Sequence, residues 1–350
     1  KVLIDQLGGE NNAEAFRALC SFPGKLNLTE ALNAAEGDKK LSLLKLASAR
    51  RCTEAADGIL KLANDKTYGQ AAIDALPGIV TAKQKYAAIS GLVTTKNEQD
   101  VAKWQKICAS ALQTLSAEEQ YKELSQFTSQ PLVPNRERLF PLLAATGTDA
   151  SVKELEKIGN KAALAALAKS PNYKAAAPLL AAAKKGDENA LSAYVRLVSE
   201  KEQNMDSRAS KLSEAFSLAK TAGNKKNIIE KLGQTPTRNA FLLVGKQLDD
   251  KELNYAAANA ARNIIEKTSE DIEYDIVKAN LEKCINIFKA TANSDLGVPI
   301  KTSSQVNDVI YSRNTVQEVY NQVLSDLQQA ESDLSVARKV PTIYRADITA

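Results

Sequence analysis

The chain of 350 residues contains no histidine, and it has one tryptophan, one methionine and 5% aromatic residues. The absence of histidine removes the most common general base and the most common zinc ligand. It also removes the Ser-His-Asp arrangement of nucleophilic hydrolases. No stretch approaches the roughly 18–20 continuous apolar residues that a transmembrane helix needs. These absences argue against the main classes of hydrolytic enzyme and against a membrane-spanning chain.

Cysteine is also scarce, and none of the four occurs in a Cys-x-x-Cys pair: Cys20, Cys52, Cys108 and Cys284. All but Cys52 lie on apolar stripes with helical spacing. We therefore expect buried free thiols, which behave as small apolar side chains. The spacing leaves a disulfide between distant parts of the chain open as an alternative.

The apolar residues that are present favour helices. They make up 44% of the chain, although aromatics contribute little, so much of the burial must come from alanine and leucine. Both residues are strong helix formers. The composition predicts an all-α protein.

Charge is nearly balanced, with 46 Lys and Arg against 42 Asp and Glu. The basic pairs lie far apart in the sequence: Lys39-Lys40, Arg50-Arg51, Lys184-Lys185 and Lys225-Lys226. A helical array that binds nucleic acid would need such charges gathered along one stripe, and its affinity would fall steeply with salt. We interpret the charges as solvated helix faces and predict no nucleic-acid partner.

No constellation in the sequence predicts catalysis. Carboxylates occur together at Glu118-Glu119, at Asp249-Asp250 and from Glu270 to Asp275. Neighbours in sequence do not face each other on a helix, as an acid/base pair must. Glycine-rich phosphate loops, calcium-binding loops and nucleophile elbows are absent. We predict no enzyme activity, no cofactor, and no catalytic, cofactor-binding or metal-ligating residues.

Segments with an apolar face at helical spacing recur from the start of the chain to about Ala292. They predict helices near 12–22, 39–49, 53–63, 69–76, 80–93, 98–115, 135–145, 151–168, 173–184, 188–199, 206–221, 225–232, 238–248, 252–266 and 270–290. Capping boxes are expected at three helix starts: Ser116 with Glu119, Ser151 with Glu154, and Thr268 with Asp271. Four glycines are expected to end helices with a positive φ: Gly147, Gly186, Gly223 and Gly233.

Two blocks of the sequence repeat the same pattern. Leu167-Ala-Lys-Ser-Pro171 and Leu232-Gly-Gln-Thr-Pro236 each precede an Ala- and Leu-rich helix, a polar turn and a second Ala-rich helix. The two prolines are far enough apart for a further helix pair, near 206–232, to lie between them. A helix pair of this kind must stack on its neighbours to complete a core. The pattern resembles the HEAT/armadillo class of α-solenoids, and that resemblance implies antiparallel helix pairs and a concave binding face.

The predicted array covers residues 1–292. The segment 117–134, with Pro131 and Pro134, breaks the rhythm and is a candidate boundary between two sub-arrays. Tryptophan and tyrosine side chains are candidates for the concave surface, although such residues more often fill gaps between helices. They are Trp104, Tyr68, Tyr86, Tyr173, Tyr194, Tyr255 and Tyr274.

The sequence changes character after the array. A loop containing Gly297-Val-Pro-Ile300 leads to a segment from Arg313 whose apolar residues follow helical spacing as far as Leu334. The text from Arg313 to Ala330, and Val340-Pro-Thr-Ile-Tyr-Arg345 after it, resembles the SusD/RagB family of outer-membrane, glycan-binding lipoproteins. The resemblance implies a tetratricopeptide-like segment over 293–350 and membership of a bacterial nutrient-import system. No sugar-binding residue can be transferred, because the matched positions belong to the family's scaffold.

These observations predict a non-catalytic binding or assembly module that is associated with glycan capture in the bacterial cell envelope. Its expected partner is a protein or a polymeric glycan on the concave face, with an outer-membrane transporter complex as the wider assembly. The alternative is an accessory region of a larger glycoside-processing enzyme. The chain opens without methionine on apolar residues typical of mid-helix, so we expect sequence before it. Two origins stay open for residues 293–350, a natural fusion to the array or a piece that is not contiguous with it.

Overall fold

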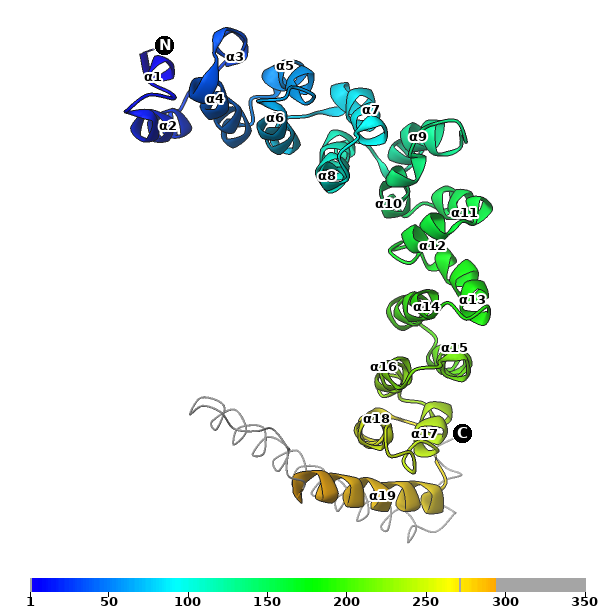
Figure 1. The fold of residues 1–350 in the computed structure, drawn as a ribbon. Helices are drawn as coiled ribbons and strands as arrows, with labels where there is room; N and C mark the ends of the chain where they lie inside the picture. The colour runs from blue at the N-terminus through cyan, green and yellow to red at the C-terminus, as the bar shows by residue number, and fades with distance from the viewer. Residues whose placement is uncertain (1, 271, 294–350) are drawn as a thin grey trace, which may run out of the picture. The chain divides into compact units, whose positions relative to one another are not determined.

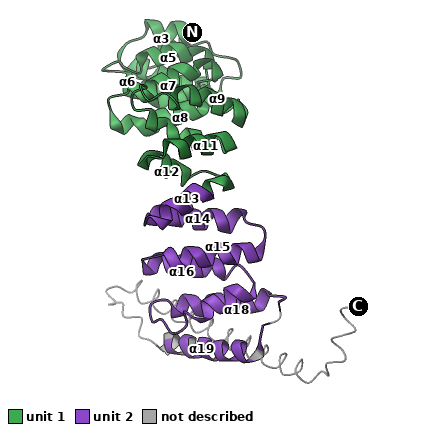
Figure 2. Ribbon diagram, turned by 90° about the vertical axis from the view of Figure 1, so that its right-hand side faces the viewer, with its two compact units in different colours: residues 1–175 green, residues 176–350 purple. Residues whose placement is uncertain are grey.

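The computed structural model describes residues 2–270 and 272–293, and every regular element in those ranges is helical. The all-α prediction is therefore confirmed. The chain forms two compact units, residues 1–175 and residues 176–350, which Figure 2 shows in green and purple. The loop and amphipathic helix predicted after Asn293 lie outside the described residues.

Unit 1 contains twelve α helices, many of them short. They are α1 (Val2–Asp5), α2 (Asn12–Ser21), α3 (Thr29–Ala34), α4 (Gly37–Arg50), α5 (Ala56–Leu62), α6 (Gly69–Ala75), α7 (Lys85–Thr94), α8 (Val101–Leu112), α9 (Ala117–Thr128), α10 (Phe140–Ala145), α11 (Asp149–Ile158) and α12 (Lys161–Leu167). Six 3₁₀ turns accompany them: η1 (Thr53–Ala55), η2 (Leu76–Gly78), η3 (Ala82–Gln84), η4 (Glu98–Asp100), η5 (Arg136–Leu139) and η6 (Tyr173–Ala175).

Consecutive helices of unit 1 pack as pairs, and the pairs stack. The pairs are α3 with α4, α5 with α6, α7 with α8, α9 with α10, and α11 with α12 (Figure 1). Contacts between alternate helices join one pair to the next: α2, α4, α6 and α8 touch in order, as do α3 and α5, α9 and α11, and α10 and α12. Unit 1 is thus a stack of helix pairs in two layers, which is the arrangement of an α-solenoid.

Unit 2 repeats this arrangement with longer helices. They are α13 (Ala176–Lys184), α14 (Glu188–Lys201), α15 (Met205–Leu218), α16 (Ala222–Leu232), α17 (Arg238–Gly245), α18 (Asn254–Lys267) and α19 (Tyr274–Asn293). One layer contains α13, α15 and α17, the other contains α14, α16 and α18, and α19 packs on α18. The helices that follow Pro171 and Pro236 match the two repeated blocks, and α15 and α16 form the predicted pair between them.

The core of each layer consists largely of small and medium-sized aliphatic side chains. Helix α18 buries four alanines: Ala257, Ala258, Ala260 and Ala261. Small side chains allow neighbouring backbones to approach closely. A Cβ at Gly233, after α16, would lie 2.9 Å from the Cα of Ala260 in α18, a distance that no real Cβ tolerates. Close backbone approach therefore fixes glycine at position 233.

Many charged side chains pair across neighbouring repeats. These pairs are Lys39–Asp5, Lys85–Glu123, Lys103–Asp74, Arg138–Glu98, Lys174–Asp149, Lys184–Glu214, Arg238–Glu273 and Lys283–Asp249. The least exposed pair joins Nζ of Lys85 in α7 to Oε1 of Glu123 in α9 at 2.7 Å. The hydrogen bond between them raises the pKa of Lys85 and lowers the pKa of Glu123. Ion pairs thus join neighbouring repeats in both units.

Three helices lie outside the predicted ranges: α1, α3 and α9. Helix α9 begins at the capping box of Ser116 and Glu119, which is confirmed: the Glu119 carboxylate accepts a hydrogen bond from the Ser116 amide at 2.9 Å. The segment 117–134 is therefore mainly a helix that packs on α10 and α11, and its prolines lie in the turn that follows. The division between the two compact units falls after Ala175.

The single helix predicted over 151–168 is wrong. Gly159 adopts a positive φ of 61° and ends α11, and the Asn160 side chain accepts a hydrogen bond from the Ala163 amide at 2.8 Å to begin α12. Glycine takes the left-handed conformation without the strain that a Cβ would cause. Gly147 and Gly186 have positive φ as expected. The same prediction fails for Gly223, inside α16, and for Gly233, whose φ is −60°.

The two other predicted capping boxes are wrong. Thr148 caps α11, because its Oγ1 accepts a hydrogen bond from the Ser151 amide at 3.1 Å. Glu154 therefore takes no part in capping α11, and its side chain faces α9. Thr268 accepts a hydrogen bond from the amide of Glu270, but the next helix begins only at Tyr274. Asp271 lies outside the described residues.

Gly91 in α7 tests the close packing of unit 1. A Cβ at this position would lie 2.3 Å from Cη2 of the buried Trp104 side chain in α8. We expect Gly91→Ala to lower the free energy of unfolding by about 1–3 kcal/mol, because the side chain overpacks the core. Urea titration followed by Trp104 fluorescence and by circular dichroism measures this change.

Gly58 in α5 provides the matched control. A Cβ there meets no atom within 4 Å, so Gly58→Ala adds helix propensity without a clash. We expect this variant to be as stable as the parent or more stable. Equal losses of stability in both variants would contradict the packing described between α7 and α8.

Candidate functional site

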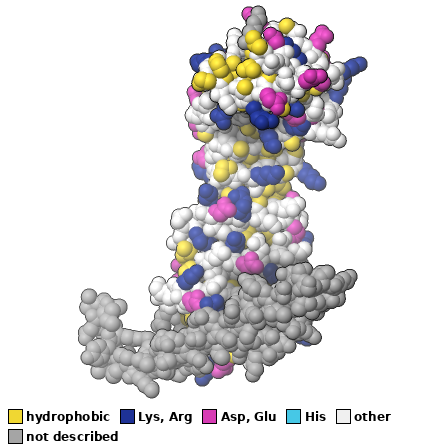
Figure 3. Space-filling model, turned by 90° about the vertical axis from the view of Figure 1, so that its left-hand side faces the viewer, with side chains coloured by type: hydrophobic (Ala, Val, Ile, Leu, Met, Phe, Trp, Pro, Cys, Tyr) yellow, Lys and Arg dark blue, Asp and Glu magenta, His cyan; other side chains and the backbone are white. Residues whose placement is uncertain are grey.

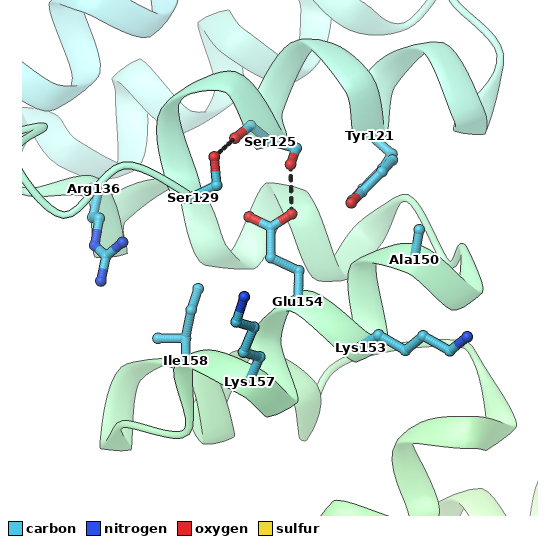
Figure 4. A pocket seen from close by; sticks show the side chains of 9 residues that line it. All are labelled: Tyr121, Ser125, Ser129, Arg136, Ala150, Lys153, Glu154, Lys157 and Ile158. Atoms are coloured by element: carbon cyan, nitrogen blue, oxygen red, sulfur yellow. Dashed lines mark hydrogen bonds between the residues drawn. The ribbon is translucent and has the colours of Figure 1, made fainter.

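A hollow of about 650 Å³ lies between helices α9 and α11 of unit 1, beside the turn that follows α9 (Figure 4). Most of the side chains that line it are polar or charged: Tyr121, Ser125, Ser129, Arg136, Ala150, Lys153, Glu154, Lys157 and Ile158. We refer to this hollow as the α9–α11 cleft. Its volume is within the range of about 300–1,000 Å³ that is usual for small-molecule sites.

The geometry of two helices brings these residues together. Tyr121 and Ser125 of α9, and Ser129 directly after its last residue, are spaced at intervals of four residues and share one face. On α11 the lining positions 150, 153, 154, 157 and 158 follow the same rule. Arg136 extends from the start of η5 toward the same hollow (Figure 4). Each wall of the cleft is therefore a single helix face.

Glu154 connects the two walls. Its Oε2 accepts a hydrogen bond from Oγ of Ser125 at 2.6 Å, and its Oε1 accepts one from Oγ1 of Thr128. Thr128 is completely buried. Both carboxylate oxygens are thus engaged by hydroxyl donors of α9. Hydrogen bonds to a charged group are among the stronger ones, so Glu154 holds α11 against α9 as well as lining the cleft.

Three cationic side chains line the same hollow as this carboxylate. Nη1 of Arg136 donates a hydrogen bond to the carbonyl oxygen of Thr128 at 2.8 Å, which fixes one end of the guanidinium group. Lys157 is directed toward Glu154, whereas Lys153 extends from the opposite end of the hollow (Figure 4). Both lysines are exposed. Cations therefore outnumber carboxylates in the lining by three to one.

The serine and threonine hydroxyl groups beside the cleft are engaged in hydrogen bonds. The hydroxyl groups of Ser125 and Thr128 donate to Glu154, and Oγ of Ser129 donates to the carbonyl oxygen of Ser125 at 2.5 Å. A pair of facing carboxyl groups, which glycoside hydrolysis generally uses, does not occur in a cleft with one carboxylate. Within residues 2–270 and 272–293, no group of three Cys, Asp or Glu side chains is placed to hold a metal ion.

The carboxylate clusters noticed in the sequence have structural roles. Glu119 caps α9, Asp249 pairs with Lys283, and Glu273 pairs with Arg238. Glu270 accepts a hydrogen bond at 2.5 Å from the amide of Arg238, which is the first residue of α17. None of these groups lies in the α9–α11 cleft.

The aromatic candidates are distributed between the helical core and the surface. Trp104 and Tyr194 are buried in the helical layers, Tyr86 and Tyr255 are exposed, and the side chain of Tyr274 lies outside the described residues. Tyr121, which lines the cleft, is absent from the predicted set. Its helix could have been placed from the Ser116 capping box, and the spacing of Tyr121, Ser125 and Ser129 then puts them on one face.

Comparisons of the chain with models of protein families, with curated proteins and with solved structures found no match. The described helices include none that is long and apolar enough to cross a membrane. Figure 3 shows Lys and Arg side chains interspersed with Asp and Glu on the face in view. The site and its chemistry therefore carry the functional argument, together with the resemblances in the sequence.

All four cysteines are free thiols, and Cys52, Cys108 and Cys284 are buried as core residues. Burial raises the pKa of Cys108 and of Cys284 to about 12. At pH 8 these two thiols are protonated and poor nucleophiles.

We expect iodoacetamide to modify the half-buried Cys20 well before Cys108 or Cys284 in the folded protein. Peptide mass spectrometry over a time course measures this order, and equal rates at Cys20 and Cys108 would contradict it.

Proposed function

We propose that this protein is a non-catalytic binding and assembly module. The observation that carries the proposal is the stacking of helix pairs in both units. A stack of this kind exposes helix faces from several consecutive repeats on one surface, which suits a long partner better than a small substrate. The α9–α11 cleft supports the same function, because its hydroxyl and carboxylate groups are held in hydrogen bonds between the two helices.

The proposed ligand is a polymeric glycan, and the proposed setting is nutrient import at the bacterial cell envelope. This part of the proposal is supported by the resemblance of residues 297–345 to SusD/RagB proteins. An outer-membrane transporter complex is the corresponding protein partner. The cleft is chemically compatible with a glycan, because tyrosine, serine, arginine and lysine side chains offer both an aromatic surface and several hydrogen-bond donors.

Binding and turnover must be measured together. In native gels that contain a panel of soluble polysaccharides, we expect at least one polysaccharide to retard the chain relative to a gel without it. In the same mixtures we expect no release of reducing ends. A reference protein without sugar affinity corrects for changes in gel viscosity.

Two results would contradict the proposal in different ways. Release of reducing ends by the purified chain would show catalysis and would reject the binding-module function. Migration unaffected by every polysaccharide would reject the glycan as ligand.

A further inference from the structure

The α9–α11 cleft has an excess of positive charge that its own carboxylate does not neutralise. Glu154 is engaged by Ser125 and Thr128, whereas three cations line the same hollow. In the part of the chain that the structure describes, no hydrogen bond or ion pair reaches Nζ of Lys157. A bound carboxylate or phosphate would neutralise this excess positive charge. The cleft therefore favours an anionic ligand.

Arg136 is held ready for such a ligand. Its Nη1 is fixed by the carbonyl oxygen of Thr128, so little conformational entropy is lost when its remaining N–H groups bind an anion. Guanidinium groups match the planar geometry of a carboxylate with two parallel hydrogen bonds. Arg136 and Lys157 lie on different elements, and Figure 4 shows both beside the hollow.

The rest of the lining fits a hydroxylated ligand. Figure 4 shows the Tyr121 hydroxyl directed into the hollow, and no described residue hydrogen-bonds to it. Ser129 retains acceptor capacity on Oγ after donating to Ser125. A hollow of about 650 Å³ has room for a sugar unit, and most of the side chains that line it carry polar groups.

We propose that the α9–α11 cleft binds an acidic sugar residue, with Arg136 and Lys157 contacting its carboxylate and Tyr121 and Ser129 contacting its hydroxyl groups. This inference rests on the proposed glycan-binding function and adds the charge class of the ligand. It also assigns recognition to unit 1 and to particular side chains. Binding of this kind weakens with added salt, because the contacts are charged and partly exposed.

Isothermal titration calorimetry of the full chain tests the proposal with three probes: a uronic acid oligomer, the same oligomer with its carboxyl groups reduced to alcohols, and inorganic phosphate. We expect the acidic oligomer to bind more tightly than both other probes. Lys157→Gln should weaken its binding about tenfold, since one charge-assisted hydrogen bond is lost. Lys157→Arg should restore most of the affinity.

Lys106→Gln is the matched control, because Lys106 is an exposed lysine of the same unit on α8. We expect this variant to bind like the parent. Equal affinity for the acidic and reduced oligomers, or equal effects of Lys157→Gln and Lys106→Gln, would overturn the acidic-sugar site and leave glycan binding in place. Phosphate that binds as tightly as the oligomer would overturn the sugar class. Absence of binding by both oligomers, and by the wider polysaccharide panel, would overturn the proposed function as well.

Discussion

The structure depends on one constraint: each helix has a single apolar stripe, and no helix pair can bury both of its stripes by itself. Helix α18 illustrates it, since it buries four alanines and packs against α16, α17 and α19. Small side chains make this packing close, as the approach of Gly233 to Ala260 shows. Each repeat is therefore stabilised by its neighbours, and the stack rather than the single helix is the folded unit.

The same constraint determines where polar chemistry can occur. Ion pairs at the edges of the layers join one repeat to the next, as Lys85 does with Glu123, so these side chains are committed to the scaffold. Between α9 and α11 the facing positions are polar, and a hollow remains in place of a core. Glu154 joins α9 to α11 through its hydrogen bonds to Ser125 and Thr128. It is also the one carboxylate among the lining residues of the hollow, which include three cations.

The architecture could be predicted from the sequence because it follows from composition and periodicity. Alanine and leucine at helical spacing indicated the helices, and the repeats around Pro171 and Pro236 indicated their pairing. The site could not be predicted, because it depends on which helix faces meet. Glu154 was expected to cap its own helix, and only the position of Thr148 shows why it reaches α9 instead. The break at Gly159 could not be predicted, because an apolar stripe continues across this residue. Its positive φ nevertheless ends α11 there.

The proposed site for an acidic glycan lies in the cleft between α9 and α11. Amide hydrogen exchange of the full chain, with and without a bound uronic acid oligomer, tests it most directly, because exchange slows where a ligand restricts local opening. We expect added protection in residues 117–128 and 149–158, with little change in α14, α16 and α18. Protection confined to those unit 2 helices, with none in α9 or α11, would contradict it.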